Sequence, residues 1–225
     1  VDLGLGSWLA RSGIALGDDV VIDPAQALQI SGGETFVASR YGAHPIVEAL
    51  DQTGTPTVFS LARSLRRADG AAPGRNPVAL IEASSTAWGE TDLARLDQVS
   101  PDGPDRLGPF PLAMAVSFSP DAASPDAIDE AKPAVDEARL LVVGDLDLFS
   151  DTFLGLTGAN ELFAANAFNW LIEREALVEI EGRAARSSRL VLLPGQLYGL
   201  AAVFLLLMPG LAVAAGVWIA IRRRR

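Results

Sequence analysis

Short apolar runs separated by polar segments make up most of the chain, and one long uncharged run closes it. Apolar runs of strand length lie at 20–22, 57–61, 78–81 and 139–144. A helix is predicted to begin at Pro45, because proline fits the first helical position, where its missing N–H costs nothing. Loops are predicted where Pro, Gly, Asp and Ala are frequent, at 68–77, 100–111 and 119–133.

The strongest local pattern is a strand, a polar turn and an amphipathic helix between residues 139 and 171. The strand Leu-Leu-Val-Val is apolar on both faces, which is typical of a buried strand in a parallel sheet. After it, Asn160 is predicted to cap a helix. One face of that helix carries Leu162, Phe163, Ala167, Trp170 and Leu171 at helical spacing. The pattern predicts an α/β fold with a parallel sheet, to which 177–180 adds an edge strand.

The uncharged run at 190–221 predicts a membrane anchor. Its residues 197–221 are long enough for a helix that spans a bilayer core about 30 Å thick. Four arginines follow, and because basic residues favour the cytoplasmic side, the N-terminal part is predicted to be exported. The alternative, a long buried core helix, fits the length, position and arginines less well. Pro209 and Gly210 interrupt the run and are candidate contacts for a partner.

These features predict four parts in a protein of the bacterial inner membrane, with the lipid bilayer as a partner. They are an exported, periplasmic α/β domain at 1–189, a juxtamembrane linker at 190–196, a transmembrane helix at 197–221 and a cytoplasmic basic tail at 222–225. The chain begins at Val1 without a signal-peptide pattern. We therefore expect an N-terminal portion of the same protein, with its own targeting or membrane segment, to precede it.

Composition narrows the possible functions. The net charge is −10, and because the last four residues are arginines, the remainder carries −14. Such an acidic surface repels nucleic acid, so no nucleic-acid partner is expected. The chain has no cysteine, which excludes disulfides, thiolate metal sites and cysteine nucleophiles. No phosphate-binding loop sequence is present, so any ATPase is expected to be another subunit.

Three aspartates after the apolar strand are the sharpest candidate for a site. Asp145, Asp147 and Asp151 lie where open α/β sheets bind ligands, and carboxylates suit a divalent cation. Aspartates in such turns more commonly bond their own backbone, and we give this structural use more weight than metal binding. Trp88 is either an exposed aromatic that recognises a partner or a core residue, and the sequence leaves both open.

A catalytic set is not evident. His44 is the only histidine, and its position before Pro45 favours a helix cap over a catalytic base. Gly4-Leu-Gly-Ser-Trp8 lacks the second glycine of a nucleophile elbow. We therefore expect no catalytic residue, no cofactor and no bound metal.

Several of these segments together resemble a known family. They are RLLVVGDLDLFSD at 139–151, NELF at 160–163, NAFNWL at 166–171, and, upstream, VIDP at 21–24, HPI at 44–46, ARS at 62–64 and SSTAWGE at 84–90. In this order, and with the apolar span and arginines that follow, they resemble the gliding-motility-type (GldG-like) auxiliary components of ABC transport systems. The resemblance covers nearly the whole chain.

The resemblance implies an exported domain of the flavodoxin-like or glutamine-amidotransferase-like group, of which this chain holds a part, beside an ABC permease and an ATPase. Amidotransferase activity needs a cysteine and is not carried over. The leading hypothesis is a noncatalytic, membrane-anchored accessory subunit whose domain binds a substrate or a partner. The alternative is a membrane-tethered hydrolase or glycan-binding protein that uses Asp145 and Asp147, with His44.

Overall fold

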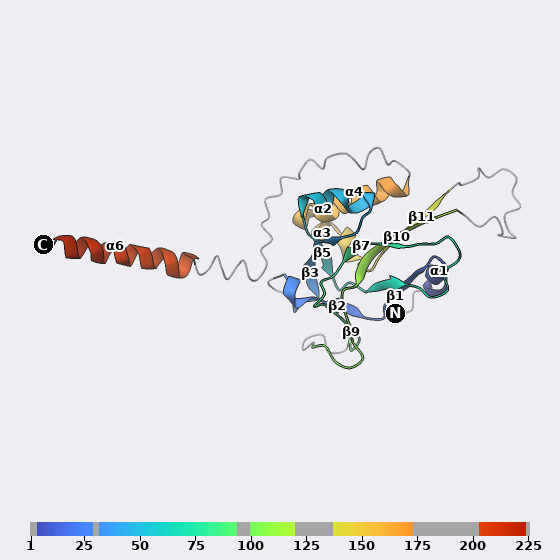
Figure 1. The fold of residues 1–225 in the computed structure, drawn as a ribbon, viewed down its shortest axis with the longest axis horizontal. Helices are drawn as coiled ribbons and strands as arrows, with labels where there is room; N and C mark the ends of the chain where they lie inside the picture. The colour runs from blue at the N-terminus through green and yellow to red at the C-terminus, as the bar shows by residue number, and fades with distance from the viewer. Residues whose placement is uncertain (1–3, 29–31, 94–99, 120–136, 173–202, 224–225) are drawn as a thin grey trace, which may run out of the picture.

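The computed structural model describes residues 4–28, 32–93, 100–119, 137–172 and 203–223 (Figure 1). Its helical elements are α1 (Gly6–Arg11), η1 (Pro24–Gln26), α2 (Pro45–Thr53), η2 (Asp147–Phe149), α3 (Asp151–Thr157), α4 (Ala159–Leu171), η4 (Val203–Leu207) and α6 (Met208–Arg223). Its strands are β1 (Ile14–Leu16), β2 (Val20–Ile22), β3 (Thr35–Ala38), β4 (Arg40–Tyr41), β5 (Thr57–Ser60), β6 (Leu65–Arg67), β7 (Val78–Glu82), β8 (Trp88–Glu90), β9 (Arg106–Leu107), β10 (Pro111–Phe118) and β11 (Ala138–Val143).

The described strands form one sheet of four strands, one of three and two pairs. The largest has the order β11-β10-β7-β4, the second has the order β2-β8-β9, and the pairs are β1-β6 and β3-β5. All the pairings among these strands are antiparallel. The long strand β10 is the centre of the largest sheet, with Val116 opposite Leu140 of β11.

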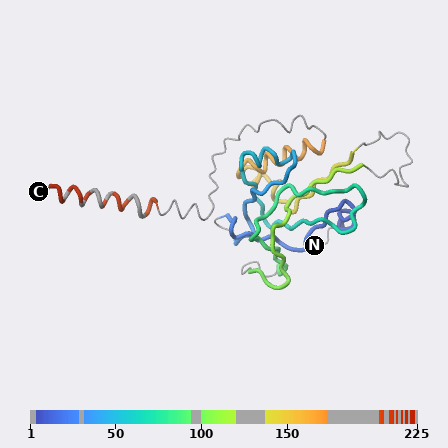
Figure 2. Tube along the Cα trace, in the orientation of Figure 1, coloured from blue at the N-terminus to red at the C-terminus, as the bar shows by residue number. Residues whose placement is uncertain are grey.

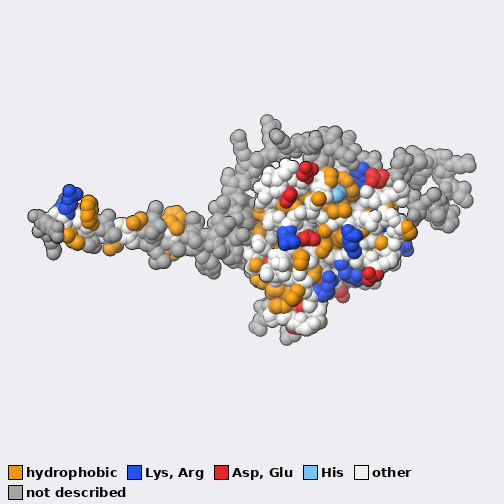
Figure 3. All heavy atoms as spheres, viewed as in Figure 1, with side chains coloured by type: hydrophobic (Ala, Val, Ile, Leu, Met, Phe, Trp, Pro, Cys, Tyr) orange, Lys and Arg blue, Asp and Glu red, His pale blue; other side chains and the backbone are white. Residues whose placement is uncertain are grey.

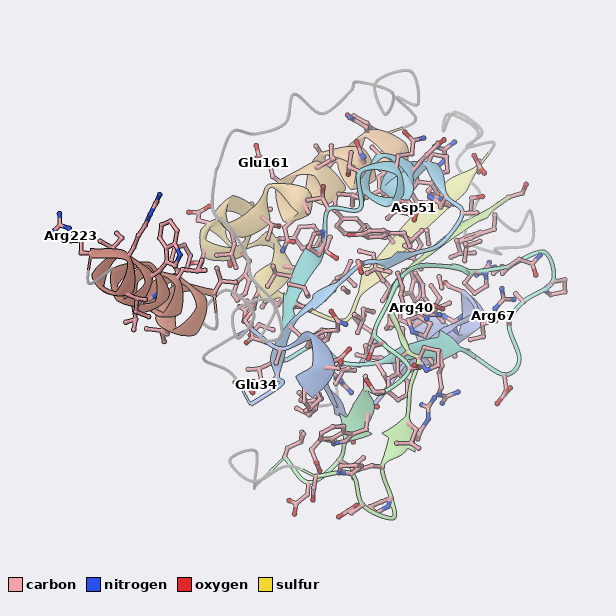
Figure 4. All side chains as sticks on the ribbon, turned by 60° about the vertical axis from the view of Figure 1, so that its left-hand side comes forward. Glu34, Arg40, Asp51, Arg67, Glu161 and Arg223 are labelled. Atoms are coloured by element: carbon pink, nitrogen blue, oxygen red, sulfur yellow. The ribbon has the colours of Figure 1, made fainter. Side chains whose placement is uncertain are left out.

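Apolar layers cover both faces of this sheet. On one face, α2 and α4 bury Leu50, Phe163 and Trp170 in the main core (Figure 1). On the other face, β1 and β6 bury Ile14 and Leu65 against residues of β10. Charged residues on the helices, such as Glu161 of α4, point away from the strands (Figure 4). The sheet is therefore the middle layer between two helices and a strand pair.

Segments distant in sequence lie beside one another at the strand pair. Figure 2 shows the N-terminal segment running beside the segment that follows β6, and hydrogen bonds join the two. The Ala68 N–H donates to the Gly13 carbonyl, and the Ala72 N–H donates to the Arg11 carbonyl. The N-terminal residues are thus an integral part of this layer.

The sequence prediction of a parallel sheet of the flavodoxin-like or glutamine-amidotransferase-like type is wrong. The structure is a mixed α/β fold in which the described strands pair antiparallel. Residues 140–143 of β11 are all apolar because Leu141 and Val143 face the helices while Leu140 and Val142 face β1 and β6. A continuous apolar run indicates that both faces of a strand are buried. An antiparallel strand has the same run when both faces of its sheet are covered.

The predicted membrane span is also not supported. Among the described residues, no helix has both the length and the apolar character needed to cross a bilayer. The helix in this region, α6, has 16 residues, and a rise of 1.5 Å per residue makes it about 24 Å long. The prediction of a single span at 197–221, and the inner-membrane location deduced from it, are corrected accordingly. The predicted linker at 190–196 and the strand at 177–180 lie outside the described residues.

Helix α2 begins and ends as its sequence indicates. Pro45 is its first residue, and the Ile46 N–H donates to Nδ1 of His44 at 3.2 Å. Gly54 closes it with a φ of 62°, a left-handed conformation that costs glycine little. The predicted capping role of His44 is confirmed.

Helix α4 begins differently from its prediction. It starts at Ala159, and Asn160 makes no capping bond. Instead, the Asn160 side chain is fully buried and pairs with both main-chain groups of Val58 in β5. The Val58 N–H donates to Oδ1 at 2.8 Å, and Nδ2 donates to the Val58 carbonyl at 2.9 Å. The Asn160 amide therefore bonds both main-chain groups of Val58, as a neighbouring strand would.

Candidate functional site

Asp145, the second residue after the end of β11, is a buried carboxylate that accepts three main-chain hydrogen bonds. Its Oδ2 accepts from the Ser60 N–H at 2.8 Å, at the end of β5. Its Oδ1 accepts from the N–H groups of Asp147 at 2.7 Å and Leu148 at 3.3 Å. Asp145 thus joins β5 to the turn that begins η2.

Burial dominates the electrostatics of this carboxyl. Removal from water raises the pKa of Asp145 to about 6, although the three N–H donors favour the ionised form. The nearby carboxylate of Asp147 raises the pKa further. The Asp145 carboxyl therefore changes its charge in mildly acidic solution.

The raised pKa predicts a pH dependence of stability that Asp145→Asn removes. Because the folded-state pKa lies above the ordinary value of 3.8, this contribution to stability is fully present below about pH 4 and is lost as pH rises through about 6. Between about pH 4 and about pH 7.5, wild type is expected to lose about 2 kcal/mol more than the variant. Urea unfolding at both pH values measures this. Equal losses in the two proteins would contradict the assignment.

The other two candidate aspartates do not complete a metal site. Asp147 is exposed in η2, and Asp151 is exposed in the first turn of α3, where its charge suits the helix dipole. Within the described ranges, no group of three His, Asp or Glu side chains could hold a metal ion. The geometry of Asp145 matches the structural use of aspartate in turns that the sequence favoured.

His44 lies against α4 and not with the aspartates. Its ring contacts Trp170 edge-on, with ring centroids 5.2 Å apart. Burial and the nearby Arg139 lower the pKa of His44, which keeps Nδ1 available to accept the Ile46 N–H. No contact links His44 with Asp145 in the described part of the chain, so the structure does not assemble the alternative catalytic set.

The predicted partner contacts have different surroundings. Trp88 is only 7% exposed in β8 and packs with Val20 and Ile22 of β2, which favours its role as a core residue. Pro209 and Gly210 are exposed near the start of α6. Their role as a contact remains a prediction.

An open apolar groove of about 720 Å³ lies beside Asp145, and we call it the β11 groove. Its lining residues are Leu16, Leu61, Arg63, Leu141, Val143, Gly144, Asp145, Leu146, Phe149, Ala167, Phe168 and Leu171. Ten of these twelve have no polar side-chain atom. Leu146 and Phe168 are 89% and 64% exposed, so large apolar side chains face solvent here. A groove of this size and lining is typical of a binding site.

The two polar side chains in the β11 groove already have partners. Arg63 donates from Nε to the Gly17 carbonyl at 2.7 Å and pairs with Asp18 at 3.2 Å. Asp145 is held by the main-chain bonds described above. The groove therefore offers apolar contact and few side-chain groups that are available to a polar ligand.

Leu61 at the rim has an unusual backbone. Its φ of 52° is the one positive value among the described residues other than glycine. Its N–H donates to the Glu34 carbonyl at 2.9 Å, which helps to hold this conformation. Backbone strain of this kind is concentrated at functional sites, and here it places an exposed leucine beside the groove.

Two further buried aspartates form cross-links that the sequence did not predict. Asp19 accepts from both the N–H and the hydroxyl of Ser64, at 3.0 and 2.7 Å. Asp23 accepts in the same way from Ser84, at 3.0 and 2.9 Å. Burial raises the pKa of Asp23. One feature of the sequence could have pointed to these bonds. Asp23, Ser64 and Ser84 belong to the short motifs at 21–24, 62–64 and 84–90, and Asp19 lies just before the first of them.

Charges of both signs are interspersed on the molecular face shown in Figure 3. Acidic side chains therefore do not form one continuous negative patch on that face. An expected lack of nucleic-acid binding remains a prediction from the total charge.

No protein-family model and no curated protein matches the chain. A solved structure described as "mmIFT52 N-terminal domain" is similar with a TM-score of 0.45 and 16% sequence identity. The match covers 74% of this chain and 56% of that one, so the chain spans about half of the length of the solved protein.

Proposed function

We propose that the chain is a noncatalytic accessory subunit of an ABC transport system, and that the β11 groove is where it binds a partner or substrate of that system. The observation that carries the binding function is the open groove with exposed Leu146 and Phe168. The transport context comes from the sequence motifs that resemble the GldG-like family. The same resemblance implies an ABC permease and an ATPase as the partners.

The alternative function, hydrolysis or glycan binding at Asp145 and Asp147, has one observation in its favour. A carboxyl with a pKa of about 6 suits a general acid. Both oxygens of Asp145 nevertheless accept main-chain bonds that hold β5 to η2. Proton exchange with a substrate would disturb those bonds, so we favour the binding function.

Co-expression tests the proposal. The chain, together with any further part of its protein, is produced with the permease and ATPase of its own genome and purified by a tag on the ATPase. The wild-type chain is expected to co-purify in a fixed ratio. Charge in the groove, introduced by Leu146→Glu with Phe168→Glu, is expected to reduce recovery at least about tenfold, since buried apolar contacts are replaced by desolvated charges.

The matched control is Leu107→Glu, because Leu107 of β9 is 71% exposed and does not line the groove. This variant is expected to co-purify like wild type. Folded wild-type protein that never co-purifies with either transporter subunit would refute the proposal. Equal recovery of the groove variant and the control would refute the role of the groove.

A further inference from the structure

Strand β11 is the last strand of its sheet and has a main-chain edge that no described residue pairs with. The Gly144 N–H donates to the Leu112 carbonyl at 2.9 Å, which fixes the alternation along the ladder with β10. In an antiparallel pair, every second residue turns its N–H and C=O away from the partner strand. The residues that turn away here include Leu141 and Val143.

Leu141 and Val143, which carry these outward main-chain groups, are both lining residues of the β11 groove. Leu141 and Val143 line it together with Leu16, which packs on one face of the sheet, and Ala167, which packs on the other. A groove that touches both layers must run past the edge of the strand. Within the described part of the chain, no hydrogen bond to the outward groups of Leu141 or Val143 is present.

We propose that the occupant of the β11 groove is an extended segment of a partner protein, which adds to β11 as a further strand. Its main chain would pair with the outward groups of Leu141 and Val143. Its successive side chains would be apolar and would point in turn to Phe168 and Leu171 on one side and to Leu16 on the other. This inference rests on the proposed function and names the kind of partner.

The chemistry of the groove selects this occupant over a small ligand. The side chains of Arg63 and Asp145 are already engaged, so the polar groups that the lining residues of β11 can still offer are the outward main-chain N–H and C=O, at strand spacing. An apolar molecule or a helix would cover these groups without bonding them, at a cost of desolvation. An extended strand pairs them and places its side chains in turn against the two apolar walls.

Peptide selection with the isolated chain provides a probe. A phage-displayed library of linear dodecapeptides is expected to yield sequences with a run of consecutive apolar residues, because both faces of the added strand meet apolar walls. On binding, the amides of Leu141 and Val143 are expected to become protected from hydrogen exchange. The amides of Leu140 and Val142 serve as internal controls, because they face β10 and are protected already.

Removal of single N–H groups separates main-chain pairing from side-chain contact. Leu141→Pro removes an outward N–H while leaving the bonds to β10, and is expected to weaken peptide binding about tenfold or more. Leu141→Ala keeps the N–H and is expected to weaken binding less. The same peptide N-methylated at the amides of one edge is expected to lose binding. N-methylation of the opposite edge, which would not face β11, is expected to be tolerated. Both peptides are tested on the unchanged protein.

Several results would overturn the inference. These are a selection without enrichment, a bound peptide that leaves both amides unprotected, and protection of both amides in the free monomer, which would mean that the chain covers its own edge. Protection that appears only on dimerisation would assign the edge to a second copy. The proposed function fails separately: a transporter complex sensitive to the groove charges but without amide protection would keep that function and refute strand addition.

Discussion

Asn160→Ala is expected to lower the free energy of unfolding by about 4 kcal/mol, because two buried main-chain groups each lose a partner worth about 2 kcal/mol. The groups are the N–H and C=O of Val58, which bond the Asn160 side chain at 2.8 and 2.9 Å. Asn160 is fully buried, so water cannot replace it without entering the core. Urea unfolding of both proteins measures the difference.

Asn169→Ala is the matched control for this prediction. It is the same substitution in the same helix, at a partly exposed position with no side-chain hydrogen bond to a described residue. Its effect is expected to stay within about 0.5 kcal/mol. Asn160→Asp keeps an acceptor for the Val58 N–H but loses the donor to its carbonyl, so it is also expected to be strongly destabilising. Similar stabilities of the Asn160 and Asn169 alanine variants would show that β5 does not depend on this amide.

Much of the local structure could be predicted from the sequence. The strand runs at 20–22, 57–61 and 78–81 correspond to β2, β5 and β7, and the helix predicted from Pro45 is α2. In α4, Phe163, Ala167 and Trp170 are buried as their spacing predicted. These features depend on nearby residues, through hydrophobic period and helix-start chemistry, so a single sequence contains them.

The direction of the strands could not be predicted in the same way. Strand β11 satisfies the pattern of a parallel strand, yet it runs antiparallel to β10. The side chains of Leu140 and Leu141 show that both faces are covered, and coverage by helices on both sides gives the same pattern as coverage by α4 and the β1-β6 pair. Direction is decided by connections between elements, which apolar patterns do not encode.

The roles of the polar residues depend on partners far away in sequence. Asp19, Asp23 and Asp145 accept bonds from serines that are 45, 61 and 85 positions away. The sequence identified the aspartates after β11 as a candidate site, and it favoured their structural use in a turn over metal binding. It could not identify Ser60 as the third donor, because no local rule brings β5 to the end of β11.

The β11 groove was not predicted for the same reason. Its walls come from β1, the segment after β5, β11 with its following turn, and α4. Each contributing run reads as ordinary core or surface by itself. Leu146 and Phe168 are the most exposed apolar residues of its lining, and isolated exposed apolar residues are common on protein surfaces.

Gly144→Ala is expected to destabilise the protein by about 3 kcal/mol, since a Cβ here would collide with the backbone of Arg63. The atom it meets is the Arg63 carbonyl oxygen, which cannot rotate away as a side chain could. The same two residues share a hydrogen bond from the Arg63 N–H to the Gly144 carbonyl at 2.8 Å. Relief of the collision must therefore move the segment that carries Leu61 and Arg63, and with it one wall of the β11 groove.

Gly155→Ala provides a control of opposite sign. Gly155 lies inside α3, and an added Cβ there meets no atom within 4 Å. Because alanine loses less backbone entropy in a helix, this variant is expected to be more stable than wild type by about 0.5 to 1 kcal/mol. Thermal and urea unfolding measure both variants. If Gly144→Ala were as stable as wild type, the close approach of Arg63 to the end of β11 would be wrong, and the groove would have a different wall.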